Sequence, residues 1–325
     1  MQRLFLVIIL IQLNALLLAQ GNNPDNKQLG LKHLHSNEVD SALYFLDNAL
    51  RENASDGEVL SGIALVYTLK GNEKKGLYYA RKARKQTNLG YSDAYLAGIL
   101  AYETKGQPLN RNRWLRQGLK LFPDDYLLLY HGGRIKKIQD IRESERLLLH
   151  SVHANPGFEE THLLLGQSMY QQGENLKAIL PLYYFLLLEN DSERSNEITA
   201  MLEFILNSWG ASAQGISRIN TAGSGIECNF IPEMFVGTQS DKKARCQWFV
   251  NQTIKLMESM MSVKTTSNNA LWEFYSDFFK RAVELNKYRA LSWHIAYSRY
   301  PSEVMEWIAG NSREYSDMID WMSLQ

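Results

Sequence analysis

Small and apolar residues recur in one order along the first half of the chain, with a period near 34 residues. Each period has a small residue, an apolar residue three positions later, a turn residue, and a small residue five positions beyond the turn. The turn residues are Asn37, Gly71, Gly106, Gln139 and Gly173. A repeat of this length predicts one helical hairpin per period. The pattern therefore predicts five helical hairpins over residues 23–191.

The residue types at these positions suit closely packed helices. Small residues at the crossings let two helices approach to ~8–10 Å, and large apolar residues fill the space between hairpins. One hairpin cannot bury both of its faces, so each hairpin packs on its neighbours. We expect an all-α fold, a curved solenoid of about five hairpins with a concave groove, followed by a C-terminal helical region.

These five units resemble the tetratricopeptide repeat (TPR). That family has Leu-Gly and Tyr on the first helix, Gly at the turn, Ala, Phe and Ala on the second helix, and Pro at its end. The chain departs from the pattern because it lacks the usual first-helix Trp, has Gln139 at the fourth turn, and has Arg111 where a small residue is expected. The resemblance implies a scaffold that binds a protein or peptide in its concave groove.

The resemblance also implies which residues line that groove, at the second, fifth, ninth, twelfth and thirteenth positions of each unit. The principal groove residues are Leu65, Leu96, Glu103, Tyr126, Leu129, Lys136, Lys137, Leu163, Gln167 and Tyr170. We expect the two tyrosines to be the anchors, since rigid aromatic side chains dominate binding hot spots. The two lysines either pair with an acidic peptide or form a solvated helix face. The family's carboxylate clamp is not reproduced, because Leu31 replaces the expected Asn.

The period is lost after Asp191. Residues 192–208 keep apolar positions at helical spacing and predict a helix that caps the last hairpin. Residues 209–240 hold five glycines, one proline and no helical period, which predicts an irregular linker or loop. Residues 241–325 predict a C-terminal helical domain, with helix candidates at 241–262, 268–285, 288–299, 302–309 and 312–323.

The N-terminus has the layout of a secretory signal. Arg3 is followed by a mostly apolar run to Leu18 and by a small residue, Ala19, ahead of a polar stretch. An uncleaved anchor is the alternative, but the run is shorter than the ~20 residues of a spanning helix. We therefore expect residues 1–19 to be a signal peptide and the product to be exported, periplasmic or secreted, with no later membrane span.

Charge and composition narrow the class of partner. Thirty-five basic residues balance thirty-five acidic ones, so no global field holds the molecule on nucleic acid or on an anionic membrane. Any charged partner must be recognised by a local patch. Only seven prolines occur in 325 residues, which agrees with long stretches of helix.

Few residues in the sequence suggest a catalytic or metal site. Cys228 and Cys246 are the two cysteines, and they predict either a disulfide or two buried free thiols. His150 and His153 share a helix face but lack a third ligand in the sequence, so we expect no metal and no cofactor.

The leading hypothesis is a non-enzymatic exported scaffold. One alternative is an enzyme or small-molecule binder in the C-terminal region, covered by the 209–238 loop and using His294, Glu227 or Cys228. The other is a structural subunit whose repeats self-associate.

Overall fold

A computed structural model describes residues 25–86, 91–213, 226–227, 230, 232–237, 241–262, 264–265 and 272–324. Residues 1–19, where we expect a signal peptide, lie outside this set, as does most of the predicted linker. The chain divides into two compact units between Leu128 and Leu129, and each unit is described by itself.

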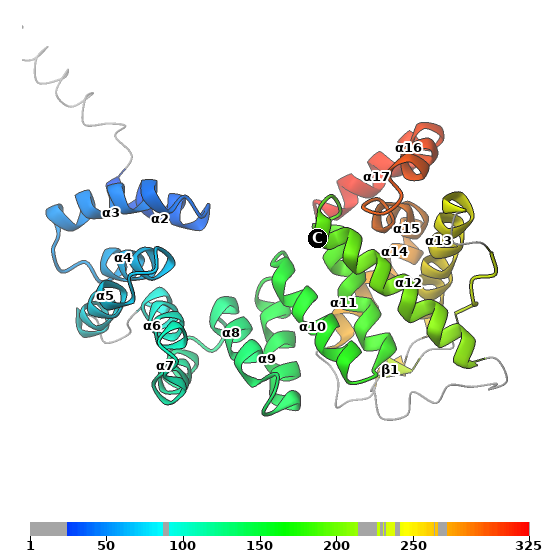
Figure 1. Ribbon diagram of the computed structural model, residues 1–325. Coiled ribbons are helices and arrows are strands. Elements are labelled where there is room, and N and C mark those ends of the chain that lie inside the picture. Colours follow the sequence, from blue (N-terminus) through cyan, green and yellow to red (C-terminus); the bar gives the residue numbers. More distant parts are fainter. Residues whose placement is uncertain are drawn as a thin grey trace, which may run out of the picture. The chain divides into compact units, whose positions relative to one another are not determined.

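Unit 1, residues 1–128, is built from hairpins of successive helices (Figure 1). Its helices are α2 (Asn26–His35), α3 (Val39–Glu52), α4 (Gly57–Leu69), α5 (Glu73–Gln86), α6 (Ser92–Thr104) and α7 (Pro108–Leu121). The small residues sit where the helices touch. A Cβ on Gly30 would lie 2.6 Å from Leu46 Cγ, and one on Gly98 would lie 2.1 Å from Trp114 Cε3.

Four of the five predicted turns share one backbone conformation and one hydrogen-bonding pattern. Asn37, Gly71, Gly106 and Gly173 have φ of 58°, 72°, 62° and 77°. In each turn this residue donates its N–H to the carbonyl three residues back, and the next residue donates to the carbonyl five back. Glycine and asparagine are the residues that enter this left-handed region most readily. Gln139 differs, since Asp140 donates to the Lys136 carbonyl four residues back.

Unit 2, residues 129–325, continues with hairpins and ends in shorter helices (Figure 1). Its helices are α8 (Tyr126–Lys136, which begins in unit 1), α9 (Ile141–Ala154), α10 (Glu159–Gln171), α11 (Asn175–Leu188), α12 (Glu193–Ala213), α13 (Lys242–Ser259), η1 (Met260–Ser262), α14 (Glu273–Glu284), α15 (Tyr288–Ile295), α16 (Pro301–Gly310) and α17 (Ser312–Met322). Two-residue strands β1 (Ile226–Glu227) and β2 (Lys264–Thr265) pair antiparallel. The predicted all-α, tetratricopeptide-type hairpin fold is confirmed.

One continuous core runs through unit 2. It extends from Leu148 to Trp321 and includes ten of the fourteen residues of α11, which explains the long apolar run in that helix. Polar contacts also cross the predicted boundary at residue 191. Trp272 Nε1 donates to Glu145 Oε1 at 2.7 Å, and the hydroxyl oxygens of Tyr183 and Thr253 lie 2.9 Å apart. The predicted domain bounds remain predictions, while the described core is shared by repeat and C-terminal helices.

Two details of the C-terminal region differ from the sequence expectation. The first is that helix α12 continues to Ala213, so the buried Trp209 belongs to it and not to the linker. The second is that residues of the predicted linker pack on that helix. Gly210 fits there because residues 232–234 pass against the helix, and a Cβ would lie 2.8 Å from the Pro232 carbonyl oxygen.

A further hairpin turn joins α14 to α15. Asn286, with φ of 56°, donates to the Val283 carbonyl at 3.0 Å, and Lys287 donates to the Ala282 carbonyl at 2.7 Å. These are the same hydrogen bonds as in the repeat turns, although the sequence shows no period in this segment.

Candidate functional site

Three of the ten predicted groove residues are core residues in the described structure. Leu65, Leu96 and Leu129 are 7%, 4% and 2% exposed. Such buried side chains fill space within the packed helices instead of facing a partner. These three leucines therefore offer little surface to a partner, and the groove as a binding site stays a prediction.

The other predicted groove residues fall in both units. Glu103 and Tyr126 are half-buried in unit 1, and five more are half-buried in unit 2: Lys136, Lys137, Leu163, Gln167 and Tyr170. Leu163 and Tyr170 pack against the core of unit 2, which limits the area that each offers to a partner.

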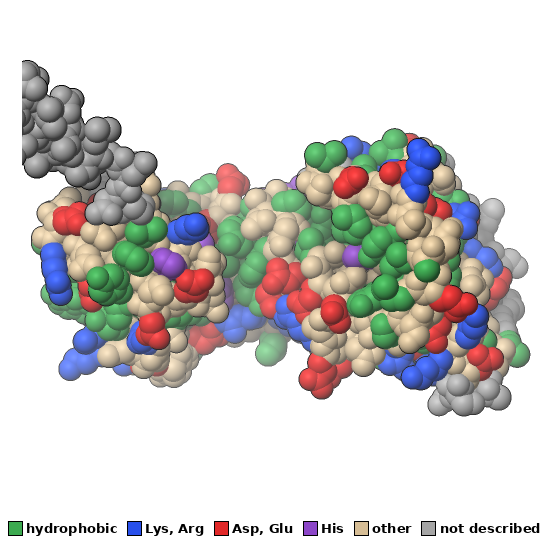
Figure 2. Space-filling view, turned by 90° about the horizontal axis from the view of Figure 1, so that it is seen from above, with side chains coloured by type: hydrophobic (Ala, Val, Ile, Leu, Met, Phe, Trp, Pro, Cys, Tyr) green, Lys and Arg blue, Asp and Glu red, His purple; other side chains and the backbone are tan. Residues whose placement is uncertain are grey.

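In unit 1 some accessible apolar positions lie on the first helices of the hairpins, although Tyr44, Tyr78 and Leu109 on the second helices are more exposed. Leu69 is 47% exposed, and Leu31 and Leu100 are half-buried. Helix α4 packs against both α2 and α6, so these three helices form one layer. We call the exposed and half-buried positions of α2, α4 and α6 the first-helix face. Figure 2 shows hydrophobic side chains exposed among charged ones on the face of unit 1 that it draws.

Acidic groups accompany these leucines, and the sequence reading did not single them out. Glu58 Oε2 lies 2.6 Å from Lys27 Nζ, and this hydrogen bond raises the pKa of Lys27. Burial raises the pKa of the Asp93 carboxyl, and the charges of Asp125 and Glu58 act in the same direction. Asp93 lies in the first turn of α6, where acidic residues are common, so the sequence alone does not mark it as part of a site. Its partial burial appears only in the structure.

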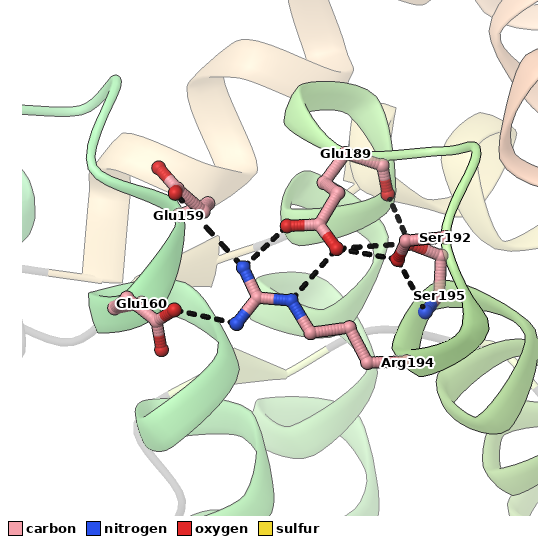
Figure 3. Close-up of polar contacts among 6 residues, drawn as sticks. All are labelled: Glu159, Glu160, Glu189, Ser192, Arg194 and Ser195. Atoms are coloured by element: carbon pink, nitrogen blue, oxygen red, sulfur yellow. Dashed lines mark hydrogen bonds and ion pairs between the residues drawn. The ribbon is translucent and has the colours of Figure 1, made fainter. Parts of the chain in front are cut away.

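Unit 2 contains a dense ionic cluster around Arg194 (Figure 3). Its guanidinium donates to Glu189 through Nε at 2.7 Å and to Glu160 through Nη1 at 2.5 Å. Glu189 also accepts from Ser192, and the Arg194 side chain lies over the Phe185 ring. The Arg194 hydrogen bond lowers the pKa of Glu189. The cluster joins the starts of α10 and α12 to the end of α11, and its donors and acceptors serve this packing.

Two histidines of unit 2 are buried and held neutral. His162 Nε2 donates to the Pro156 carbonyl at 2.9 Å, and Nδ1 accepts from the Tyr275 hydroxyl at 2.7 Å. His294 Nδ1 lies 2.8 Å from the Tyr315 hydroxyl oxygen. Burial lowers the pKa of each histidine to about 4. Both rings therefore act as neutral hydrogen-bonding parts of the core.

The remaining candidates for chemistry are not gathered together. Cys246 is a free, buried thiol, and burial raises its pKa to about 12. Cys228 and the side chain of Glu227 lie outside the described residues, so their approach to His294 is not observed. In the described ranges no three His, Cys, Asp or Glu residues are grouped as metal ligands. No helix among the described residues has the length and apolar character needed to cross a bilayer.

No family model matches this chain, and no curated protein matches it in sequence. Several solved structures are similar to part of it. A thermophilic TPR protein from Thermus thermophilus is 18% identical with a TM-score of 0.46, over 56% of this chain and 97% of that one. PilF of Pseudomonas aeruginosa is 16% identical with a TM-score of 0.47, over 58% and 89%. The likeness concerns the fold alone, and the hairpins and turns described above independently establish a tetratricopeptide-type architecture.

Proposed function

We propose that this chain is an exported, non-enzymatic scaffold that holds a protein or peptide partner on the first-helix face. The observation that carries the proposal is the exposed Leu69. Ten of the thirteen residues of α4 are buried, yet this leucine is 47% exposed on a helix that packs on both sides. Half-buried Leu31 and Leu100 on the neighbouring first helices extend the apolar area.

The chemistry of the face favours a partner segment with apolar side chains. Leucines supply contact area, which drives association through the hydrophobic effect. The carboxylates of Glu58 and Glu103 on the same helices already pair with Lys27 and Arg111, so the apolar contact carries the proposal. Export is supported by the signal-like residues 1–19, which suggest that the partner is met outside the cytoplasm.

Site-directed photo-crosslinking in intact cells tests the binding face. A benzophenone amino acid replaces Leu69 or Leu100, and Leu109, 86% exposed on α7, serves as the matched control. We expect one discrete adduct from the first two positions and none from the control, with the adduct lost when Leu31→Glu is added. Equal crosslinking from all three positions, or none from any, would reject the first-helix face as the site.

Export has its own test. Cell fractionation should place the full chain in the envelope or medium, and deletion of residues 1–19 should retain it in the cytoplasm. Cytoplasmic location of the full chain would reject export while leaving the binding proposal open to the crosslinking result.

A further inference from the structure

The second helices of two neighbouring hairpins in unit 1 carry a strong local charge. Helices α5 and α7 together hold ten lysines and arginines and only one acidic residue, Glu73. The basic residues are Lys74, Lys75, Arg81, Lys82, Arg84, Lys85, Arg111, Arg113, Arg116 and Lys120. The whole chain is balanced at thirty-five of each sign, so this excess is a local property of these two helices. We call these basic positions the α5–α7 basic surface.

A hollow of about 270 Å³ lies within this surface. Arg81, Arg84 and Arg113 line it together with Tyr102 and Trp114. The walls come from α5, α6 and α7 of unit 1, so the hollow is formed by two adjacent hairpins.

Two of the three guanidinium groups are held in fixed positions by neutral partners. Arg81 Nη2 donates to the Tyr102 hydroxyl at 2.9 Å, and Arg84 Nη2 donates to Gln117 Oε1 at 2.9 Å. The Arg84 guanidinium also lies 4.2 Å from the centre of the Trp114 ring. A guanidinium stacked on an aromatic face keeps its in-plane N–H groups directed outward. The hollow therefore presents oriented donors before any ligand binds.

No carboxylate is paired with these three arginines among the described residues. Arg84 is half-buried, while Arg81 and Arg113 are exposed. Half-buried arginines elsewhere in the described chain do have such partners: Arg111 pairs with Glu103, Arg194 with Glu189, and Arg245 with Glu203. Three like charges gathered around one hollow repel each other, and an anion placed among them would relieve that repulsion. The arrangement is what an anion site requires.

We propose that the α5–α7 basic surface binds an acidic segment of a protein, with one carboxylate seated in the arginine hollow. Planar guanidinium groups match carboxylates through paired hydrogen bonds. Each helix has fourteen residues and is therefore about 21 Å long, which about six extended residues would span. This surface belongs to the second helices, so the proposal goes beyond the first-helix face and does not depend on it.

Fluorescence anisotropy with a labelled hexaglutamate peptide and the full chain tests the proposal. We expect hexaglutamate to bind at low ionic strength, and hexaglutamine not to bind. Arg84→Gln and Arg113→Gln should each weaken binding by about fivefold or more. Arg116→Gln removes the same charge from α7 without touching the hollow and should weaken binding less than twofold. Arg84→Lys keeps the charge but loses the stacked fork, and should behave like Arg84→Gln.

The outcomes distinguish binding in the hollow from non-specific attraction to the basic surface, and they distinguish an acidic protein segment from another polyanion. Equal weakening by Arg113→Gln and Arg116→Gln would overturn the hollow as the binding site. Arg113 makes no hydrogen bond or ion pair among the described residues, so its variant should leave the fold intact and keep this comparison valid. Tighter binding of a single-stranded hexanucleotide than of hexaglutamate in the same buffer would overturn the assignment to an acidic protein segment. Leu69 crosslinking should be unchanged in every variant, because it reports the other face.

Discussion

Acidification should destabilise unit 2 through His162, whose neutral ring joins α10 to α14. The ring donates to the Pro156 carbonyl through Nε2 and accepts from Tyr275 through Nδ1, so a second ring proton would lose the Tyr275 hydrogen bond. Burial also opposes the charged form and lowers the pKa of His162 from 6.5 to about 4. The folded unit therefore takes up this proton at a lower pH than the unfolded chain.

The size and sign of the effect follow from these two pKa values. Between pH 6.5 and about 4 the unfolded chain carries the proton and the folded unit does not, so stability is complete above that window and falls as pH decreases through it. A difference of roughly 2.5 pH units corresponds to about 3 kcal/mol from this one group. His294, with its pKa also lowered to about 4, adds a separate loss in the same direction.

Urea unfolding followed by tryptophan fluorescence measures this change. Six of the seven tryptophans lie in unit 2, so the signal is dominated by it. We compare the full chain with His162→Gln at pH 7 and pH 4. The variant should be less stable at pH 7, because it loses the ring contacts. On going to pH 4 it should lose about 3 kcal/mol less than the unchanged chain. The exposed His35, changed to Gln, is the control.

An equal pH dependence for the unchanged chain and His162→Gln would refute the reasoning. It would mean that the ring takes its second proton in the folded state as readily as in the unfolded chain. If the stability of the His35→Gln control depended less on pH than that of the unchanged chain, the effect would not come from burial of a histidine.

Two more perturbations test how each unit is held together. Glu145→Ala removes the carboxylate that accepts from Lys177 at 2.8 Å and from Trp272 at 2.7 Å, leaving a buried ammonium unpaired. It should lower the free energy of unfolding of unit 2 by about 3 kcal/mol in urea melts, and adding Lys177→Met should restore much of the loss. Gly98→Ala places a methyl group 2.1 Å from the Trp114 ring. It should destabilise unit 1 by about 1–3 kcal/mol in thermal melts, and an unchanged melting temperature would contradict the close helix crossing.

The sequence was informative where structure depends on neighbouring residues. The turn positions Gly71, Gly106 and Gly173 could be predicted because a left-handed backbone favours glycine wherever it occurs. The small residues at crossings, such as Gly30 against Leu46, could be predicted because only their size admits a second helix. These local requirements recur with the repeat, and that recurrence made the hairpins recognisable.

The candidate sites were less accessible from sequence. The positions of Leu65, Leu96 and Leu129 in their helices resemble those of groove residues, but their burial depends on neighbouring helices. The break between the helices at residues 286–287 was predicted, but the left-handed turn at Asn286 was not, because asparagine there stands without a periodic partner in the sequence.

The sequence by itself determined the helical hairpins and their turns, since backbone conformation and residue size act over a few positions. Only the tertiary structure decided which side chains remain available. Arg84 and Gln117 are thirty-three residues apart, yet their side chains meet across two hairpins beside Trp114. His162 and Tyr275 are 113 residues apart and share one buried hydrogen bond. The burial and the charge environment of a side chain depend on all the residues around it, and the packing of the helices determines which residues those are.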